Sequence, residues 1–259
     1  MRLYRIVKHR RLSSLEIRLI FRTPRLMPAK RKRRRPLPIA ACQSVIRWFF
    51  RVLFTLVYRI RVYGLENYPE KDGLLICSNH QSYLDPLILG IVCPRPVNYL
   101  GRKSLFRFAP MGWFMAWNDT IPIDRDASGI GGMKETMRRL KRGESVIMFP
   151  EGTRTPDGEI HSFKLGFAAM SRRTKSTLQP VGFDGAFQAY PRNQKLPGLG
   201  RIHVVMGKPI PFEEYESLDD QQTSELLESR IRSCFEQSQV HWRRSQLLPV
   251  QSAVEQLTR

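Results

Sequence analysis

A histidine and an aspartate stand five positions apart in the segment CSNHQSYLDP, residues 77–86, directly after a short apolar run. Histidine removes protons well near neutral pH, and a carboxylate that accepts its Nδ1–H leaves Nε2 free as a base toward an incoming hydroxyl. His80 and Asp85 could therefore form a general base and its orienting partner. The same residues also fit a helix start, with Asp85 as the cap and Pro86 at the first helical position. Both roles are compatible, because a carboxylate has two oxygens.

The surroundings of His80 carry no signature of a protein nucleophile. The sequence contains no Gly-x-Ser-x-Gly elbow, and Ser78 and Ser82 lie beside His80 without a special turn pattern. A histidine–aspartate pair without a serine or cysteine partner suits direct attack by a substrate hydroxyl, with no covalent enzyme intermediate.

A second polar segment, FPEGTRTPDGEIHSFKLG at residues 149–166, also begins where an apolar run ends. Glycine permits close approach of a ligand to the backbone, and the planar guanidinium of Arg154 suits a phosphate or carboxylate. Lys164 adds a second cation to this segment, and Arg125 follows another apolar run. We expect these cations to form a site for a phosphate-bearing substrate, although a basic surface hairpin fits the segment equally well.

Short apolar runs predict the strands that position these segments. The predicted strands are residues 73–78, 120–123, 145–149, 178–183 and 201–207. Helical patterns over residues 85–92 and 131–143 alternate with them, and the second ends at Gly143. The alternation predicts an α/β fold, in which a single domain holds a mixed, mostly parallel sheet flanked by helices. Because loops at the carboxyl ends of parallel strands form the binding crevice, both polar segments are expected at the same sheet edge.

Length and charge divide the chain into one folded domain with extensions. The 259 residues are 42% hydrophobic and 25% charged, which is ordinary for a folded protein. The formal net charge of +20 is concentrated at the start, where residues 1–38 contain 14 basic residues and one acid. We interpret residues 1–38 as a solvated basic arm, 39–62 as an amphipathic helix, 63–240 as the folded domain and 241–259 as a loose tail. An amphipathic helix over residues 218–235 closes the folded domain.

The apolar segment at residues 39–60 has the length of a membrane span but contains Arg47, Arg51 and Arg59. Each charge at the centre of a bilayer costs roughly 2.5 kcal/mol or more. On a helix the three arginines fall within one arc of about 120°, which favours a helix lying in the membrane interface. A core helix with a solvated arginine edge has the same pattern. The basic run at residues 30–35 fits anionic lipid, nucleic acid or a transit peptide, and the apolar helix that follows favours lipid.

Four motifs together resemble a known enzyme family. NHQSYLD, beginning at Asn79, resembles the NHxxxxD motif of the glycerolipid acyltransferases, the 1-acyl-sn-glycerol-3-phosphate acyltransferase family. TIPIDRD, FPEGTRT with its FKLG, and LQPVGF resemble the second, third and fourth blocks, in the family's order. Thr155 stands where serine is usual, and Gln179 precedes Pro180 where an apolar residue is usual. The resemblance extends from about residue 45 to residue 235 and implies the glycerol-3-phosphate acyltransferase-like fold.

The resemblance also implies roles for individual residues. His80 is the general base and Asp85 orients it, and the attacked carbonyl belongs to an acyl thioester on coenzyme A or acyl carrier protein. The residues assigned to substrate binding are Asn79, Arg125, Glu151, Gly152, Thr153, Arg154, Lys164 and Pro180. Within this set Pro180 would shape the site from the neighbouring strand, and Asn79 would either fix the turn or donate a hydrogen bond. No cofactor or metal is expected, and the four cysteines, which lack metal or redox spacing, are expected to be reduced.

The implied function is transfer of a fatty acyl group to the free hydroxyl of 1-acyl-sn-glycerol 3-phosphate (lysophosphatidic acid), giving phosphatidic acid in phospholipid biosynthesis. The enzyme would be peripheral or monotopic at the cytoplasmic face of a membrane, with the lipid surface as its partner. Another lysophospholipid or a lyso-aminolipid is the alternative acceptor. A non-catalytic nucleic-acid-binding protein is disfavoured, because the cations are concentrated in the arm and do not follow one folded face with interleaved aromatic residues.

Overall fold

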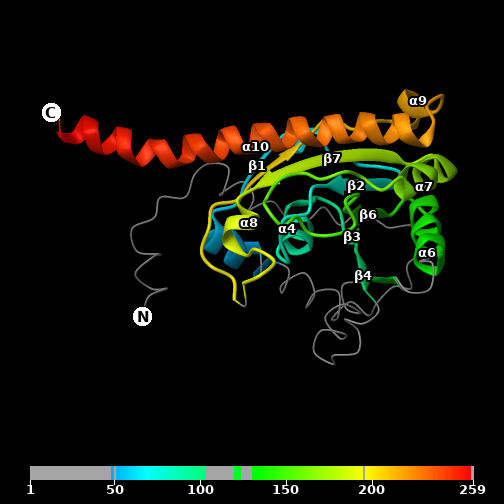
Figure 1. Ribbon diagram of the computed structural model, residues 1–259, viewed down its shortest axis with the longest axis horizontal. Coiled ribbons are helices and arrows are strands. Elements are labelled where there is room, and N and C mark those ends of the chain that lie inside the picture. The colour runs from blue at the N-terminus through cyan, green and yellow to red at the C-terminus, as the bar shows by residue number, and fades with distance from the viewer. Residues whose placement is uncertain (1–47, 50, 103–119, 124–129, 195, 258–259) are drawn as a thin grey trace.

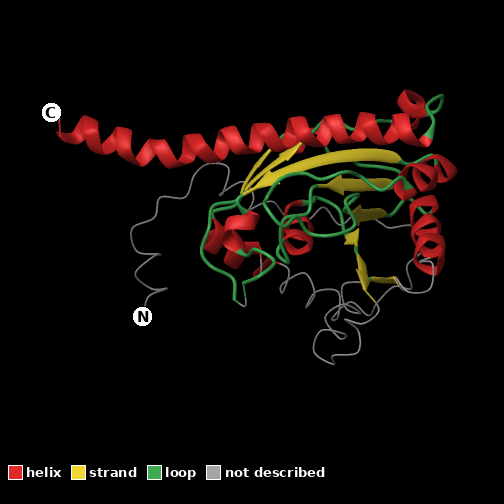
Figure 2. Ribbon diagram, in the orientation of Figure 1, coloured by secondary structure: helices red, strands yellow, loops and turns green. Residues whose placement is uncertain are grey.

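A mixed six-stranded sheet forms the centre of the molecule (Figures 1 and 2). The computed structural model describes residues 48–49, 51–102, 120–123, 130–194 and 196–257. In spatial order, the strands of the sheet are β1 Arg61–Tyr63, β8 His203–Met206, β7 Thr177–Asp184, β2 Leu74–Ser78, β6 Ser145–Met148 and β3 Val97–Asn98. A separate parallel pair consists of β4 Leu100–Arg102 and β5 Ile121–Ile123.

The pairing of the strands decides which loops meet. Strand β2 pairs in parallel with both β6 and β7, so all three carboxyl ends lie at one edge of the sheet. Strand β8 runs antiparallel to β7 and parallel to β1, which brings the beginnings of β1 and β8 to that same edge. The predicted α/β class with a mixed, mostly parallel sheet is confirmed, as is the common edge of the two polar segments.

Helices cover both faces of the sheet. They are α4 Asp85–Val92, α6 Ile130–Lys141, α7 Gly166–Thr174, α8 Ala186–Ala189, α9 Phe212–Tyr215 and α10 Asp220–Leu257, with a 3₁₀ turn η1 at Leu65–Asn67. Helix α10 packs along β7 and β8 on one face, and α4 lies on the opposite face (Figure 1). The predicted helices at residues 85–92 and 131–143 correspond to α4 and α6.

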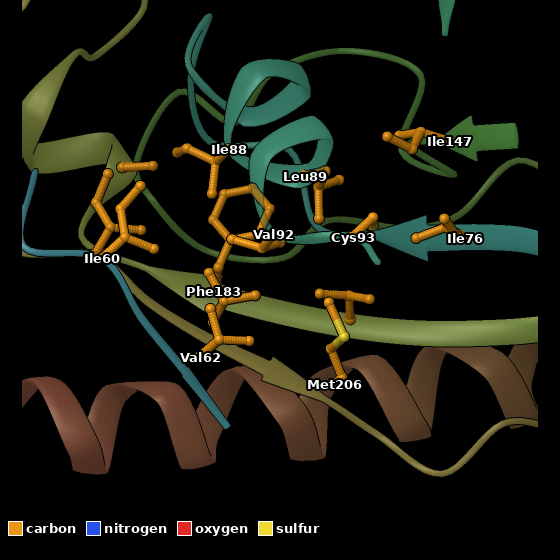
Figure 3. Packing of buried hydrophobic residues seen from close by; sticks show 14 of the residues in the cluster. Ile60, Val62, Ile76, Ile88, Leu89, Val92, Cys93, Ile147, Phe183 and Met206 are labelled. Carbon is orange, nitrogen blue, oxygen red and sulfur yellow. The ribbon is translucent and has the colours of Figure 1, made fainter. Parts of the chain in front are cut away.

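Strand β2 shows how one apolar run serves two cores. Its residues alternate, with Leu74 and Ile76 on the α4 side and Leu75 and Cys77 on the α10 side. A strand that is buried on both faces needs a continuous apolar run, which explains why LLICS was recognisable in the sequence. Figure 3 shows the α4-side core, where α4 packs over Ile76, Phe183 and Met206.

The predicted amphipathic helix at residues 39–62 is too long at its carboxyl end. Residues 51–58 are helical, Arg59 has a left-handed backbone with a φ of 45°, and Arg61 begins β1. Arg61–Tyr63 pair with β8 as a three-residue strand, although the helical sequence pattern continues into them. The tertiary pairing overrides the local pattern here. The portion before residue 48 lies outside the described residues.

The polar side of the same helix faces the protein and not the solvent. Arg51 and Thr55 are buried against the protein, and Arg51 Nη2 donates a 2.6 Å hydrogen bond to the carbonyl of Ile91 in the last turn of α4. Trp48 and Phe49 are 51% and 55% exposed. The idea of a core helix with a solvated arginine edge is therefore wrong for Arg51.

The carboxyl-terminal segment is helical, where the sequence suggested a loose tail at residues 241–259. Helix α10 continues to Leu257 and extends past the sheet (Figure 1). Its sequence contains no glycine and many good helix formers, and Pro249 is the one residue in it that disfavours a helix interior. Within the described part of the chain, none of the helices combines the length and apolarity needed to cross a membrane.

Candidate active site

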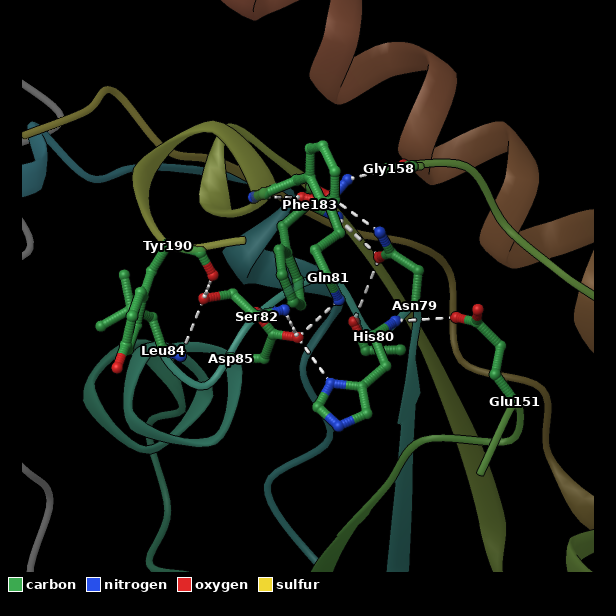
Figure 4. A network of polar contacts seen from close by, with 12 residues as sticks. Asn79, His80, Gln81, Ser82, Leu84, Asp85, Glu151, Gly158, Phe183 and Tyr190 are labelled. Carbon is green, nitrogen blue, oxygen red and sulfur yellow. Dashed lines mark hydrogen bonds and ion pairs between the residues drawn. The ribbon is translucent and has the colours of Figure 1, made fainter. Parts of the chain in front are cut away.

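The loop between β2 and α4, residues 79–84, holds the predicted pair together and is named the catalytic loop below (Figure 4). His80 Nδ1 lies 2.6 Å from Asp85 Oδ2. The backbone N–H groups of Gln81 and Ser82 donate to the same oxygen, at 2.6 and 2.7 Å. Three donors thus converge on one carboxylate oxygen, which fixes the loop around His80.

Asp85 does not cap α4 in the expected way. Leu84 is the N-cap residue, and the carboxylate of Asp85 turns back to the preceding loop and makes no hydrogen bond to the first N–H groups of the helix. Pro86 stands in the first turn, where its missing N–H costs nothing. Burial of Asp85 raises the pKa of its carboxyl group, and the hydrogen bonds from His80, Ser82 and Gln81 counteract that rise.

The ring of His80 is held from a second side by Phe149, the residue that follows β6. The two rings are stacked, with centroids 4.0 Å apart and planes 16° from parallel. Because an ionised Asp85 only accepts hydrogen bonds, Nδ1 of His80 carries a proton and Nε2 has a free lone pair. Figure 4 shows Nε2 pointing away from Asp85. The geometry is that of a general base with an orienting carboxylate.

Asn79 joins two strands through the backbone, which agrees with the alternative in which it fixes the turn. Its Nδ2 donates to the carbonyl of Phe183 at 2.9 Å, and its Oδ1 accepts from the N–H of Phe183 at 3.1 Å. The side chain is buried. Asn79 therefore joins the end of β2 to β7, with both ends of its amide engaged by the backbone.

Glu151 is also turned toward the backbone and is not available to a substrate. Its Oε1 accepts the N–H of His80 at 2.8 Å, and its Oε2 accepts the N–H of His161 at 3.3 Å. The carboxyl group is buried, and burial raises its pKa to about 7. The neighbouring Thr155 N–H donates to the carbonyl of His80 at 2.8 Å. The segment after β6 thus holds both backbone groups of His80, which corrects the assignment of Glu151 to acceptor binding.

Arg154 is placed as a free cationic group beside the catalytic loop. Its Cζ lies 3.4 Å from the ring centroid of Tyr83, which is 52% exposed, and its Nη1 is buried and has no hydrogen-bond partner among the described residues. Gly152 adopts a left-handed φ of 70°, and a Cβ there would meet Lys164 Nζ at 3.0 Å, so the lysine lies over this turn. Thr153 is exposed in the same turn. Thr153 and Lys164 are exposed and Arg154 is partly exposed, so the assignment of these three residues to an anion site stays a prediction.

Two further residues of the predicted substrate-binding set are Pro180 and Arg125. Pro180 is buried within β7 opposite Cys77, and a Cβ on Gly207 would lie 3.1 Å from its ring, so it belongs to the sheet packing under α10. Pro180 therefore lies in the strand next to β2, as expected, but its ring packs inside the protein. Arg125 lies outside the described residues.

Sequence reasoning missed residues that complete the loop. Gln81 is buried and bridges two segments, since its Nε2 donates to the Gly158 carbonyl at 3.0 Å and its Oε1 accepts the N–H of Phe187 at 3.3 Å. Phe149 and Tyr83 were missed as well, because an aromatic residue beside an apolar run is equally typical of a core. In the sequence Tyr83 lies close to His80 and Phe149 lies close to Arg154, and this closeness was the available signal.

Comparison with known proteins identifies the class of protein to which the chain is similar. Residues 59–184, which contain His80, Asp85, Glu151 and Arg154, match the family model described as Acyltransferase. The chain belongs to this family of acyltransferases.

Individual relatives share much of the chain. A 1-acyl-sn-glycerol-3-phosphate acyltransferase of Bacillus subtilis is 28% identical over 187 residues, which are 70% of this chain and 91% of that protein. The one from Pseudomonas aeruginosa is 32% identical over 176 residues, 66% of each chain. The chloroplastic LPAT1 of Arabidopsis thaliana is 31% identical over 176 residues, and the chain spans about half of its length, 49%.

A solved structure shares the fold. The crystal structure of the 1-acyl-sn-glycerophosphate (LPA) acyltransferase PlsC from Thermotoga maritima superposes with a TM-score of 0.67 at 23% identity, covering 79% of this chain and 83% of that one. The described elements therefore form the same α/β architecture as that enzyme.

Proposed function

We propose that this protein transfers a fatty acyl group from an acyl thioester to the free hydroxyl of 1-acyl-sn-glycerol 3-phosphate, giving phosphatidic acid. The observation that carries the proposal is the buried Asp85 carboxylate on His80 Nδ1, next to an arginine with an unpartnered buried N–H group. A base and an anion-binding cation at one sheet edge suit an acceptor with both a hydroxyl and a phosphate. The printed names of the relatives support the same acceptor.

The proposed reaction is a direct displacement at the thioester carbonyl. Nε2 of His80 takes the proton of the acceptor hydroxyl as its oxygen forms a bond to the carbonyl carbon. The carbon–sulfur bond then breaks, and the leaving thiolate receives the proton from the imidazolium. Asp85, 2.6 Å from Nδ1, stabilises the imidazolium that forms between the two proton transfers. No acyl-enzyme and no cofactor other than the thioester co-substrate is required.

The phosphate of the acceptor would bind to Arg154, with Lys164 as a second cation. The guanidinium lies over the Tyr83 ring, and its buried Nη1, which has no hydrogen-bond partner among the described residues, is a donor that an entering phosphate oxygen would satisfy. Coenzyme A and acyl carrier protein both present the same thioester to His80, so either donor fits this mechanism.

The helix at residues 51–58 supports association with a membrane surface, where a lysophospholipid is found. Its polar Arg51 and Thr55 are buried against the protein, whereas Trp48 and Phe49, which precede it in the sequence, are exposed. An aromatic pair at the start of an apolar helix suits the headgroup region, and basic residues nearby attract anionic lipid. We expect a peripheral or monotopic enzyme on the cytoplasmic face.

An acceptor panel tests the proposed function. The full-length protein is incubated with labelled acyl-CoA or acyl carrier protein, and products are separated by thin-layer chromatography. The acceptors are 1-acyl-sn-glycerol 3-phosphate, other lysophospholipids, a lyso-aminolipid and a monoacylglycerol that lacks the phosphate. Labelled phosphatidic acid is expected, and product only from the other acceptors would overturn the assignment.

The phosphate site is tested in the same assay. Arg154→Ala should raise the KM for 1-acyl-sn-glycerol 3-phosphate, because a charge-assisted contact is lost, and leave the KM for the thioester unchanged. His241→Ala, which removes a half-buried histidine on α10, is the matched control. An effect confined to the thioester would assign Arg154 to the other substrate.

A further inference from the structure

The loop between α8 and β8 presents two leucines to solvent. Leu196 and Leu199 are 75% and 66% exposed, more than any other large hydrophobic side chain in the part of the chain that the structure describes. Single exposed leucines are common on protein surfaces, but two within four residues of one loop form a local apolar tip.

The loop is fixed at both ends to functional parts of the molecule. At its beginning, the Tyr190 carbonyl accepts a 2.9 Å hydrogen bond from Ser82 Oγ of the catalytic loop. At its end, the N–H of Ile202 donates to the carbonyl of Tyr58, the last residue of the 51–58 helix, at 2.9 Å. The loop therefore extends from the catalytic loop to this helix, and Figure 1 shows it projecting below α8.

The interior of the loop is also held in place. The N–H of Gly198 donates to the carbonyl of Ala189 at 2.7 Å, and a Cβ on Gly200 would lie 3.0 Å from the Ala189 side chain. These two glycines let the loop pack closely on α8. The leucines are consequently presented by an anchored segment.

The charge around the leucines is positive. Residues 191–201, PRNQKLPGLGR, contain three basic residues and no acid. Arg201 lies where β1 and β8 begin, near Arg59 and Arg61, and burial together with repulsion from these two cations lowers the pKa of Arg201. An apolar tip in a loop whose sequence carries only basic charges matches an anionic lipid interface, where leucine side chains enter the acyl region and arginines remain among the headgroups.

We propose that the α8–β8 loop is a second contact with the membrane surface, in which Leu196 and Leu199 insert into the interface beside the active site. The inference rests on the proposed function only in taking the acceptor to be a membrane lipid. The exposed Trp48 and Phe49 of the neighbouring helix continue the same kind of surface. These two neighbouring contacts would hold the catalytic loop against the bilayer, so that the acceptor reaches His80 without leaving the membrane.

The test compares one double variant with a matched control in the full-length protein. Leu196→Ser with Leu199→Ser removes the apolar tip, and Val240→Ser removes an apolar side chain of similar exposure from α10. Binding is measured by co-sedimentation with vesicles of phosphatidylcholine with and without phosphatidylglycerol. Acyl transfer is measured with the acceptor in those vesicles and, separately, dispersed in detergent. Thermal unfolding verifies that both variants are folded.

The double variant should bind anionic vesicles roughly 10- to 100-fold more weakly, since part of the burial of two leucines is lost. Its rate on vesicle-borne acceptor should fall in parallel, while its rate on detergent-dispersed acceptor stays within about twofold of wild type. Wild-type binding and vesicle rates in the double variant would overturn the proposal. A loss confined to the KM for acyl carrier protein would overturn it in favour of a protein-docking surface. Absence of acyl transfer by the wild type in detergent would contradict the proposed function instead, and the sedimentation result would still decide the role of the loop.

Discussion

Substitutions of Asp85 should separate the structural role of its carboxylate from its catalytic role. One oxygen, Oδ2, accepts hydrogen bonds from His80 Nδ1 and from the N–H groups of Gln81 and Ser82, all at 2.6 to 2.7 Å. Asp85→Ala removes this acceptor, whereas Asp85→Asn keeps an oxygen of the same size without the charge. The two variants therefore differ in what they leave unsatisfied.

The loss of stability follows from the buried donors. Gln81 and Ser82 are both buried, so their N–H groups have no access to water when the acceptor is removed. Each unsatisfied buried donor costs about 1–3 kcal/mol, and Asp85→Ala should therefore lower the free energy of unfolding by about 2–6 kcal/mol. Asp85→Asn should cost less, about 2 kcal/mol or below, because its carbonyl still accepts these bonds without charge assistance.

Catalysis, unlike stability, should depend on the negative charge of Asp85, so that Asp85→Asn loses most of its activity although it loses little stability. A neutral amide does not stabilise the imidazolium of His80, and an amide NH₂ turned toward Nδ1 would move the ring proton to Nε2 and abolish the base. The corresponding aspartate-to-asparagine change in a serine protease triad lowers kcat about 10⁴-fold. We expect Asp85→Asn to lower kcat by roughly 10³- to 10⁴-fold while the protein remains folded.

Urea unfolding followed by circular dichroism gives the stability, and initial rates at saturating substrates give kcat. Asp219 is the matched control, because its Oδ1 does cap a helix by accepting the N–H of Gln222 at 2.7 Å, outside the site. Asp219→Asn should lose at most about 1 kcal/mol and keep its kcat. A folded Asp85→Asn protein with kcat within tenfold of wild type would refute the catalytic pair, and a fully stable Asp85→Ala protein would refute the loop argument.

Two further changes test neighbouring groups. Burial raises the pKa of Glu151 to about 7, so the protonated folded state is favoured; this carboxyl's contribution to stability is present below its ordinary pKa and is lost as pH rises through about 7. Between about pH 5 and pH 8, Glu151→Gln should therefore lose less unfolding free energy than wild type in urea titrations, and parallel pH profiles would contradict this. Tyr83→Leu should raise the acceptor KM roughly 2- to 30-fold at similar kcat, because the cation–π contact with Arg154 is lost, whereas Tyr83→Phe should not. In an Arg154→Ala background Tyr83→Leu should add nothing, and an undiminished effect there would show that Tyr83 acts independently.

Much of the fold was predictable because its central strands are buried and therefore read as apolar runs. The apolar runs that predicted strands at residues 73–78, 145–149 and 178–183 correspond to β2, β6 and β7. Strands β3 and β4 contain two and three residues, too few to show a period of two. Strand β1 was hidden at the end of a helical pattern, and its pairing with β8 is a contact between distant residues that local pattern does not encode.

The sequence predicted which residues lie together at the site, but not whether each side chain faces a ligand or the backbone. Neighbouring parallel strands bring His80 and Arg154 to one edge, which the alternation of elements implied. Whether a polar side chain faces a ligand or the backbone depends on the local turn, and Asn79 and Glu151 both proved to bind backbone groups. The stacking of Phe149 on His80 depends equally on three-dimensional placement.

The account depends most directly on His80 as the base that activates the acceptor hydroxyl. The decisive measurement is kcat for His80→Gln with labelled acyl thioester and 1-acyl-sn-glycerol 3-phosphate, because glutamine can still donate a hydrogen bond to Asp85 but cannot take up the proton. General-base catalysis contributes about 10²- to 10⁴-fold. The account predicts a folded variant whose kcat is at least roughly 100-fold below wild type, and a folded variant with kcat within tenfold of wild type would contradict it.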